Sequence, residues 1–271
     1  MLTADSSQAA VRLERRDDGV VVLTLDDPDR RNAMTEAMGD ALTDAARSLA
    51  DDRELRAVVL TGAPPAFSAG GDLGMLEDLA RRTREEGLDA SDTMLAFYRR
   101  FLSVRDIPVP VVAAINGHAI GAGLCVALAC DLRIVAEDAK VGLNFSQLGL
   151  HPGMAGTWLL PRILGQQRAA ELLYTGRLVS GREAAGYGLA LDARPADEVL
   201  ERGLELAGEI ATASPVVVRQ LKQTLATTER ATLEEALARE AACQAVSYDS
   251  EDLTEGPASA RERRAPRFPG R

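Results

Sequence analysis

The sequence contains few aromatic residues and few of the cysteines that stabilise small secreted or zinc-binding proteins. Aromatic residues make up 4% of the 271 residues, and the only cysteines are Cys125, Cys130 and Cys243. An odd number of cysteines, without a CxxC pair or a histidine cluster, argues against a disulfide framework and against structural zinc, and it fits a reducing compartment. We therefore expect a cytoplasmic protein that holds no metal ion.

Signals for a membrane or for nucleic acid are also weak. The segment 1–11 lacks the basic and apolar regions of a secretory signal. The one apolar run of membrane length, 111–130, is interrupted by Asn116, Gly117 and His118. The 31 Lys and Arg residues against 41 Asp and Glu residues give a net charge of −10. Such an excess of acid disfavours nucleic acid or an anionic membrane as the main partner.

Almost all the cations are arginines. The only lysines are Lys140 and Lys222, and the planar guanidinium of arginine suits phosphate and carboxylate groups. The most basic segment is 256–271, at the end of an otherwise acidic chain. This pattern fits a solvated tail or a segment that contacts an anion.

The first two thirds of the chain predict an alternating α/β fold. Strands at 10–16 and 20–26 flank the turn Asp17-Asp18-Gly19, which predicts a hairpin. A helical pattern covers 35–50. Short apolar strands follow at 56–62, 109–115 and 131–137, with helical segments between them. Such an alternation excludes a helix bundle and a β-sandwich.

The character changes after Pro195. Segments 197–213, 215–228 and 232–248 carry helical periodicity, and Thr232 followed by Glu235 is typical of a capping box. The sequence therefore predicts two parts, a mixed domain at 1–195 and a helical region at 196–271.

Two glycine-rich loops are candidates for chemistry. The segments 65–73 and 116–124 each lie between a predicted strand and a predicted helix. Backbone N–H groups at such a helix start can stabilise an anion or a developing oxyanion, although tight packing alone can explain one such loop. A nicotinamide site is the weakest interpretation, because Gly117, Gly121 and Gly123 lack the GxGxxG order and a following ribose-binding acid.

The joint pattern resembles the crotonase superfamily, the enoyl-CoA hydratase/isomerase family. The matching motifs are DPDRRNAM at 27–34, AFSAGGDL at 66–73, NGHAIGAGLCVALACD at 116–131, LGLHPGMAGT at 148–157, TGRLVSGREAAGYG at 175–188 and Glu255-Gly256 before the basic tail. The resemblance implies an α/β spiral of ββα units followed by a C-terminal helical trimerisation region. It also implies a homotrimer or a dimer of trimers, and an enzyme that binds an acyl-CoA thioester, with coenzyme A as part of the substrate and no other cofactor.

The resemblance also assigns roles by position. The backbone N–H groups of Ala69 and Ala122 would form the oxyanion hole for the thioester carbonyl. Residues at the adenine and phosphate end would be Arg30, Arg31 and Ala33, and Arg263 falls where the family often has a basic residue that reaches a CoA phosphate. Residues flanking the pantetheine arm would be Ala66, Gly70, Asp72 and Leu73.

The sequence departs from the family at its carboxylates. Cys125 and Phe145 stand where family hydratases carry two glutamates, and Gly153 stands where related isomerases and dehalogenases carry an aspartate. Neither cysteine without a nearby cation nor phenylalanine can replace a carboxylate base. A two-glutamate hydration mechanism is therefore unavailable, and His151 is the nearest remaining candidate acid or base.

Three functions remain open from the sequence. The first is an enzyme of the enoyl-CoA hydratase/isomerase type, a lyase or isomerase with an altered set of proton-transfer groups. The second is an acyl-CoA-binding homologue without catalysis. The third is a hydrolase, isomerase or lyase of the same fold that uses another base such as His151, although the absence of a GxSxG motif weakens a serine hydrolase.

Overall fold

The computed structural model describes residues 10–228 and 230–271, and it contains two sheets built largely from parallel strands. The larger sheet has the order β1-β2-β3-β5-β7-β10 and the smaller has the order β4-β6-β8-β9. The larger sheet consists of β1 (Val11–Arg15), β2 (Val20–Leu25), β3 (Ala57–Gly62), β5 (Val111–Ile115), β7 (Leu132–Ala136) and β10 (Asp192–Arg194). The smaller consists of β4 (Ala66–Ser68), β6 (His118–Ile120), β8 (Lys140–Gly142) and β9 (Val179–Ser180). The predicted hairpin is confirmed, because β1 pairs with β2 in antiparallel register.

The chain passes from one sheet to the other in each turn of the fold. β3 is followed by β4, β5 by β6, and β7 by β8, and the first member of each pair belongs to the larger sheet. Helices follow each pair, so each turn is a ββα unit. The predicted spiral is confirmed, and each glycine loop runs from the corner between paired strands, across the second strand, to the start of the following helix.

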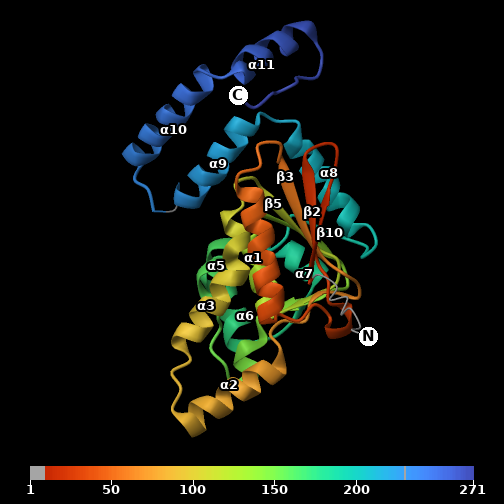
Figure 1. The fold of residues 1–271 in the computed structure, drawn as a ribbon, viewed down its shortest axis with the longest axis vertical. Helices are drawn as coiled ribbons and strands as arrows, with labels where there is room; N and C mark the ends of the chain where they lie inside the picture. The colour runs from red at the N-terminus through yellow and green to blue at the C-terminus, as the bar shows by residue number, and fades with distance from the viewer. Residues whose placement is uncertain (1–9, 229) are drawn as a thin grey trace, which may run out of the picture.

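Helices cover the sheets and separate the spiral turns (Figure 1). They are α1 (Glu36–Ala50), α2 (Leu73–Glu86), α3 (Ser91–Leu102), α4 (Ala122–Ala129), α5 (Gly156–Leu164), α6 (Gln166–Thr175), α7 (Gly181–Gly186) and α8 (Val199–Ala211). Three short 3₁₀ turns are η1 (Pro28–Arg30), η2 (Ser103–Asp106) and η3 (Asn144–Leu148). Helix α4 is buried along its whole length. Its mostly small side chains let the sheets approach it closely.

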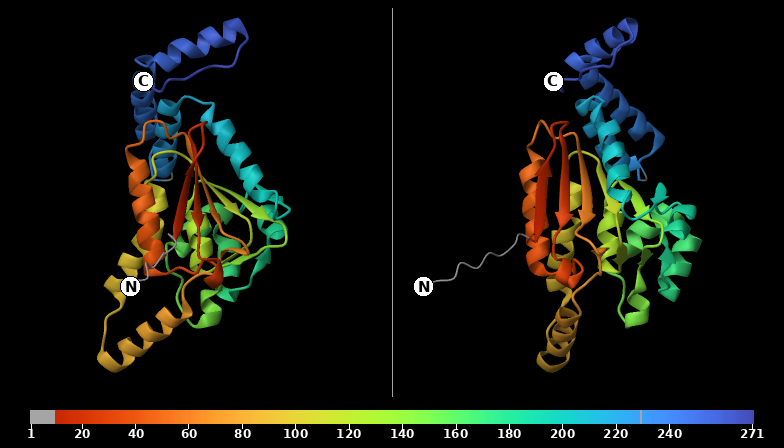
Figure 2. Two further views of the ribbon diagram at one scale, coloured as in Figure 1. Left: turned by 45° about the vertical axis from the view of Figure 1, so that its right-hand side comes forward. Right: turned by 90° about the vertical axis from the view of Figure 1, so that its right-hand side faces the viewer.

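The boundary predicted at residue 195 separates helix α8 from the larger sheet, on which this helix packs. Helix α8 packs across β3 and β5, and a Cβ atom on its Gly203 would lie 3.2 Å from the Ala114 Cβ. The helices that project from the body are α9 (Pro215–Thr228), α10 (Leu233–Tyr248) and α11 (Glu251–Glu262), as Figures 1 and 2 show. Sequence patterning found α9 and α10, with the Thr232 capping box, but not α11 as a separate helix, because α11 contains Gly256 and Pro257.

Candidate functional site

The first glycine loop is held from inside by a buried asparagine. The Asn32 side chain is fully buried, and its Nδ2 donates to the carbonyl oxygens of Ala63 and Ala66, each at 2.8 Å. The Ser68 hydroxyl donates to the Asn32 carbonyl oxygen at 2.7 Å. A buried amide with several partners fixes backbone position, because leaving any of these groups unpaired would cost free energy. The loop is therefore rigid before any ligand arrives.

The structure corrects the predicted donor on this loop. The Ala69 N–H donates to the Arg31 carbonyl oxygen at 2.9 Å, and the Met34 N–H donates to the Gly70 carbonyl oxygen at 2.7 Å. The Ala69 N–H is thus already paired, and the prediction that it serves the oxyanion hole is wrong. In residues 10–228 and 230–271 the Gly71 N–H donates to no acceptor. Gly71, two residues after Ala69, is therefore the free donor at this loop.

The second glycine loop ends at the start of α4. Gly121 precedes the helix with φ at +52°, a conformation that favours glycine, and its N–H donates to the Gly142 carbonyl oxygen at 2.8 Å. Ala122 is the first helical residue, and its N–H finds no acceptor within the described chain. An unpaired N–H is expected in a first helical turn, where the helix dipole also favours negative charge.

The two loops touch each other. A Cβ atom on Gly70 would lie 3.6 Å from the Ala122 nitrogen and 2.5 Å from the Ile120 carbonyl oxygen. A Cβ atom on Gly123 would lie 2.7 Å from the Ser68 side chain. Tight packing at Gly70 and Gly123 therefore brings together the loops that carry the Gly71 and Ala122 donors, which joins the two interpretations that the sequence left open.

A cavity of about 490 Å³ opens beside these loops. The predicted residues that line it are Arg30, Ala33, Ala69, Gly70, Asp72, Leu73, Ala122 and His151. Gly71 lines it as well. Three predicted residues, Ala66, Arg31 and Arg263, are not among its lining residues. Ala66 is buried in β4, where its carbonyl oxygen accepts from Asn32.

The predicted arginines lie in three different settings. Arg30 lines the cavity and forms an ion pair with Asp27, with 2.6 Å between Nη2 and Oδ2. Arg31 is exposed, and its backbone is left-handed. Arg263 caps the C-terminus of α11, at the opposite end of the subunit from α2 in Figure 1. Within one chain, therefore, only Arg30 stands at the cavity, and any contact of Arg263 with a ligand there needs a neighbouring subunit.

Few side chains at the cavity can transfer a proton. Burial raises the pKa of the Cys125 thiol to about 12, and this thiol donates to the Gly153 carbonyl oxygen at 3.5 Å. The Phe145 ring lines the wall beside Gly121. Asp72 caps α2, because its Oδ1 accepts the Met75 N–H at 2.8 Å. Neither position 125 nor position 145 supplies a base, and the Asp72 carboxylate serves as a helix cap.

His151 is the one histidine at the cavity. Its side chain is exposed and lines the wall, and its Nδ1 lies 2.9 Å from the Pro152 carbonyl oxygen. Because a carbonyl oxygen only accepts, Nδ1 carries a proton in this contact, and in the neutral ring Nε2 is then the nitrogen with the lone pair. His118 is structural, since its Nδ1 accepts the Lys140 N–H at 3.0 Å.

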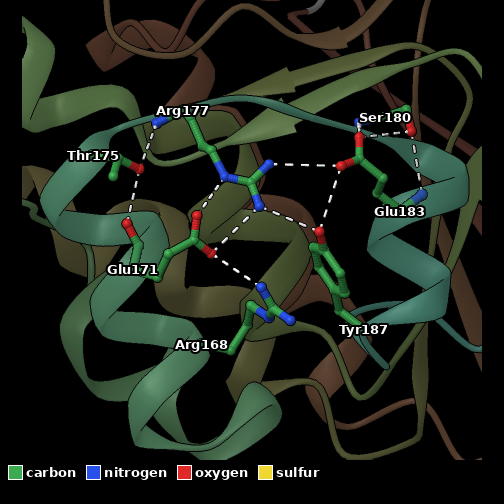
Figure 3. A network of polar contacts seen from close by, with 7 residues as sticks. All are labelled: Arg168, Glu171, Thr175, Arg177, Ser180, Glu183 and Tyr187. Carbon is green, nitrogen blue, oxygen red and sulfur yellow. Dashed lines mark hydrogen bonds and ion pairs between the residues drawn. The ribbon is translucent and has the colours of Figure 1, made fainter.

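The segment 175–188 packs against η3, which forms part of the cavity wall. Arg177 is bound by Glu171, Glu183 and Tyr187, as Figure 3 shows. Hydrogen bonding to Arg177 lowers the pKa of Glu171, and hydrogen bonding to Ser180 lowers that of Glu183. The Gln147 Nε2 donates to the Thr175 carbonyl oxygen at 2.6 Å, which ties η3 to the end of α6. The motif thus positions η3, which carries Asn144 and Phe145 into the cavity.

Comparison with known proteins agrees with this architecture. The model of the enoyl-CoA hydratase/isomerase family matches residues 15–271. The chain belongs to this family. It is 38% identical over 249 residues to a putative enoyl-CoA hydratase of Thermus thermophilus, covering 92% of this chain and 97% of that protein. It is 40% identical over 212 residues to a probable enoyl-CoA hydratase of Mycobacterium tuberculosis, covering 78% and 80% of the two chains.

A solved relative shows the same fold. The crystal structure of an enoyl-CoA hydratase from Bacillus anthracis superposes with a TM-score of 0.88 at 32% identity, covering 97% of this chain and 100% of that one. Family membership and the crotonase fold are thus confirmed. The described residues contain no helix that is long and apolar enough to cross a membrane, and within them no group of acidic, histidine or cysteine side chains could hold a metal ion.

Sequence reasoning missed several residues of the site. Asn32 lay inside the DPDRRNAM motif, and Gly71 lay inside AFSAGGDL, but neither received a role. Tyr98 and Asn144 also line the cavity. Tyr98 belongs to α3, and the sequence pattern does not show in which direction its side chain points.

Proposed function

We propose that this member of the enoyl-CoA hydratase/isomerase family binds an acyl-CoA thioester and stabilises its enolate or oxyanion through the N–H groups of Gly71 and Ala122. The carrying observation is that these two unpaired donors come from loops in mutual contact beside one cavity. Preorganised backbone donors in a partly dry site are a strong way to stabilise developing negative charge. The names of the relatives support an acyl-CoA substrate.

Catalysis in this proposal differs from two-glutamate hydration. Cys125 and Phe145 cannot exchange a proton with substrate at neutral pH. The Nε2 of His151, whose exposed ring lines the cavity, is the available base. The reaction class that fits is therefore chemistry at an enolate, with His151 or bulk water as the base.

The binding part of the proposal is tested by calorimetry with butyryl-CoA and with free CoA. Both should bind, because Arg30 at the cavity serves the phosphates, and Arg30→Ala should weaken both ligands alike. Butyryl-CoA should bind more tightly than CoA, because its acyl group buries apolar surface in the cavity. Absence of binding by either ligand would contradict the proposal.

A second candidate is an acyl-CoA-binding protein without catalysis, favoured by the missing carboxylates. Turnover separates the two. An assay over enoyl-, hydroxyacyl- and acyl-CoA thioesters should show a reaction that Ala122→Pro removes. Binding without turnover of any thioester would favour the binding protein.

We also propose that the chain assembles as a homotrimer or a dimer of trimers. The projecting helices expose apolar side chains, among them Leu221, Leu225, Leu233, Leu237 and Val246. Burial of such side chains between subunits is favourable. Light scattering at micromolar concentration should give the mass of a trimer or hexamer, and a monomer mass would contradict the assembly.

A further inference from the structure

The phenol of Tyr98 fills the space beside Gly153. A Cβ atom on Gly153 would lie 2.4 Å from the Tyr98 Oη and 2.5 Å from its Cζ, so no larger residue fits there while Tyr98 keeps its place. The Cys125 thiol donates to the carbonyl oxygen of the same glycine. The Tyr98 phenol and the Cys125 thiol therefore both contact Gly153. Positions 125 and 153 are two of the three positions where related enzymes carry carboxylates.

The Tyr98 hydroxyl is an unpaired polar group of this wall. It makes no hydrogen bond within residues 10–228 and 230–271, although every deeply buried side-chain nitrogen or oxygen there is paired. The side chain is half-buried and lines the cavity, among apolar neighbours such as Met94, Phe97 and Met154. A polar tip among apolar neighbours is typical of a group that orients a ligand.

The protonation state fixes the direction of the hydrogen bond. Burial, together with the nearby Cys125 thiol, raises the pKa of Tyr98 above its usual value. The phenol therefore keeps its proton at neutral pH and acts as a donor, not as a base.

The position of the phenol suggests which oxygen it meets. Cys125, its neighbour on Gly153, lies three residues after the Ala122 donor on α4, which is about 4.5 Å of helix rise. An oxygen on the third carbon of an acyl chain is separated from the thioester oxygen by a similar distance.

We propose that the Tyr98 hydroxyl donates a hydrogen bond to an oxygen on the third carbon of the acyl group, and so selects 3-oxygenated acyl-CoA thioesters over plain ones. The inference rests on the proposed acyl-CoA binding. It gives the wall near Cys125 and Gly153 a neutral donor in place of a carboxylate. The Tyr98 phenol then occupies the space that a side chain at position 153 would need.

Calorimetry with matched ligands tests the proposal. The ligands are butyryl-CoA and the two enantiomers of 3-hydroxybutyryl-CoA, and the proteins are the full-length wild type, Tyr98→Phe and the control Tyr174→Phe, whose residue is 81% exposed on α6. The wild type should bind one enantiomer about tenfold more tightly than butyryl-CoA, as expected for one well-formed hydrogen bond. Tyr98→Phe should lose this preference while keeping its affinity for butyryl-CoA, and Tyr174→Phe should match the wild type.

The remaining outcomes overturn the proposal in distinguishable ways. Equal affinities in the wild type, or an unchanged preference in Tyr98→Phe, would show that the phenol does not contact the oxygen. Equal weakening of all ligands by Tyr98→Phe would show a packing role only. Failure of the wild type to bind any of the thioesters would instead contradict the proposed function, and the inference with it.

Discussion

The cavity and the segment of the Arg177 network both adjoin η3, but they differ in their charged groups. In the network, Glu171 and Glu183 bind one arginine, and the pKa of each carboxyl is lowered. In the cavity, Asp72 is the only carboxylate among the described lining residues, and it caps a helix. Carboxylates in this chain therefore hold structure near the site, whereas the site itself contains neutral donors.

The difference has a physical consequence for chemistry. A carboxylate close to the thioester would accept and donate protons, but its charge would also repel an enolate across a medium of low polarity. Neutral N–H groups at Gly71 and Ala122 attract the same charge without that repulsion. The contrast favours a site that stabilises an anion over one that moves protons between two acids.

Removal of the Ala122 donor should have the largest effect. Ala122→Pro deletes the N–H at the first position of α4, where proline is well tolerated, so the helix should persist. Any turnover found in the thioester panel should fall by about 10²–10³-fold, as for loss of one oxyanion donor. Ala122→Gly keeps the N–H and is the matched control. Full activity in the proline variant, with a normal melting temperature, would remove Ala122 from the oxyanion hole.

A carboxylate introduced into the cavity should make its charged groups more like those of the Arg177 network. Phe145→Glu places an acid on η3 beside Gly121. Crotonyl-CoA hydration should rise by up to about 10²-fold, the lower end of general acid–base contributions. Phe145→Gln has the same shape without the acid and should stay at the wild-type rate. An unchanged rate in the glutamate variant, with butyryl-CoA still bound, would show that position 145 does not reach the reacting carbons.

Most of the architecture could be predicted from the sequence, but only part of the site. Apolar periodicity located α1 and strands β2, β3, β5 and β7, because burial dictates that pattern locally. The donor assignment failed at Ala69, since which N–H is free depends on the pairing of Arg31 and Met34 with the loop. The direction of the Tyr98 side chain could not be predicted for a similar reason. Its contact with Gly153 joins α3 to a distant turn, and no local pattern records it.

Loss of Asn32 should loosen the first loop. Asn32→Ala leaves the carbonyl oxygens of Ala63 and Ala66 without their buried donor. Stability should fall by about 3 kcal/mol, because each unpaired buried group costs about 1–3 kcal/mol. Urea unfolding measures this loss. Asn116→Ala, which removes a less buried amide bound to Gly62, should cost less. Equal stability of the wild type and Asn32→Ala would contradict the role of Asn32 as the internal support of the loop.

The smallest effect is expected in the Arg177 network, and it should depend on pH. Hydrogen bonding to Arg177 lowers the folded-state pKa of Glu171 from 4.5, so this contribution is complete above that pH and is lost as the pH falls through the folded value. Arg177→Met should therefore lower the melting temperature slightly at pH 7 and converge with the wild type in acid. Arg47→Met, at an exposed pair on α1, is the control. A difference that persists unchanged at pH 3 would contradict this account.

The central claim is that Gly71 and Ala122 stabilise an enolate without help from carboxylates. Acetoacetyl-CoA tests it directly, because its enolate absorbs in the near ultraviolet while its keto form does not. With a chelator present, the wild type should raise the enolate absorbance of the bound ligand, and Ala122→Pro should bind the ligand without that rise. Bound acetoacetyl-CoA that shows no enolate in the wild type, or the same enolate in Ala122→Pro, would contradict the claim.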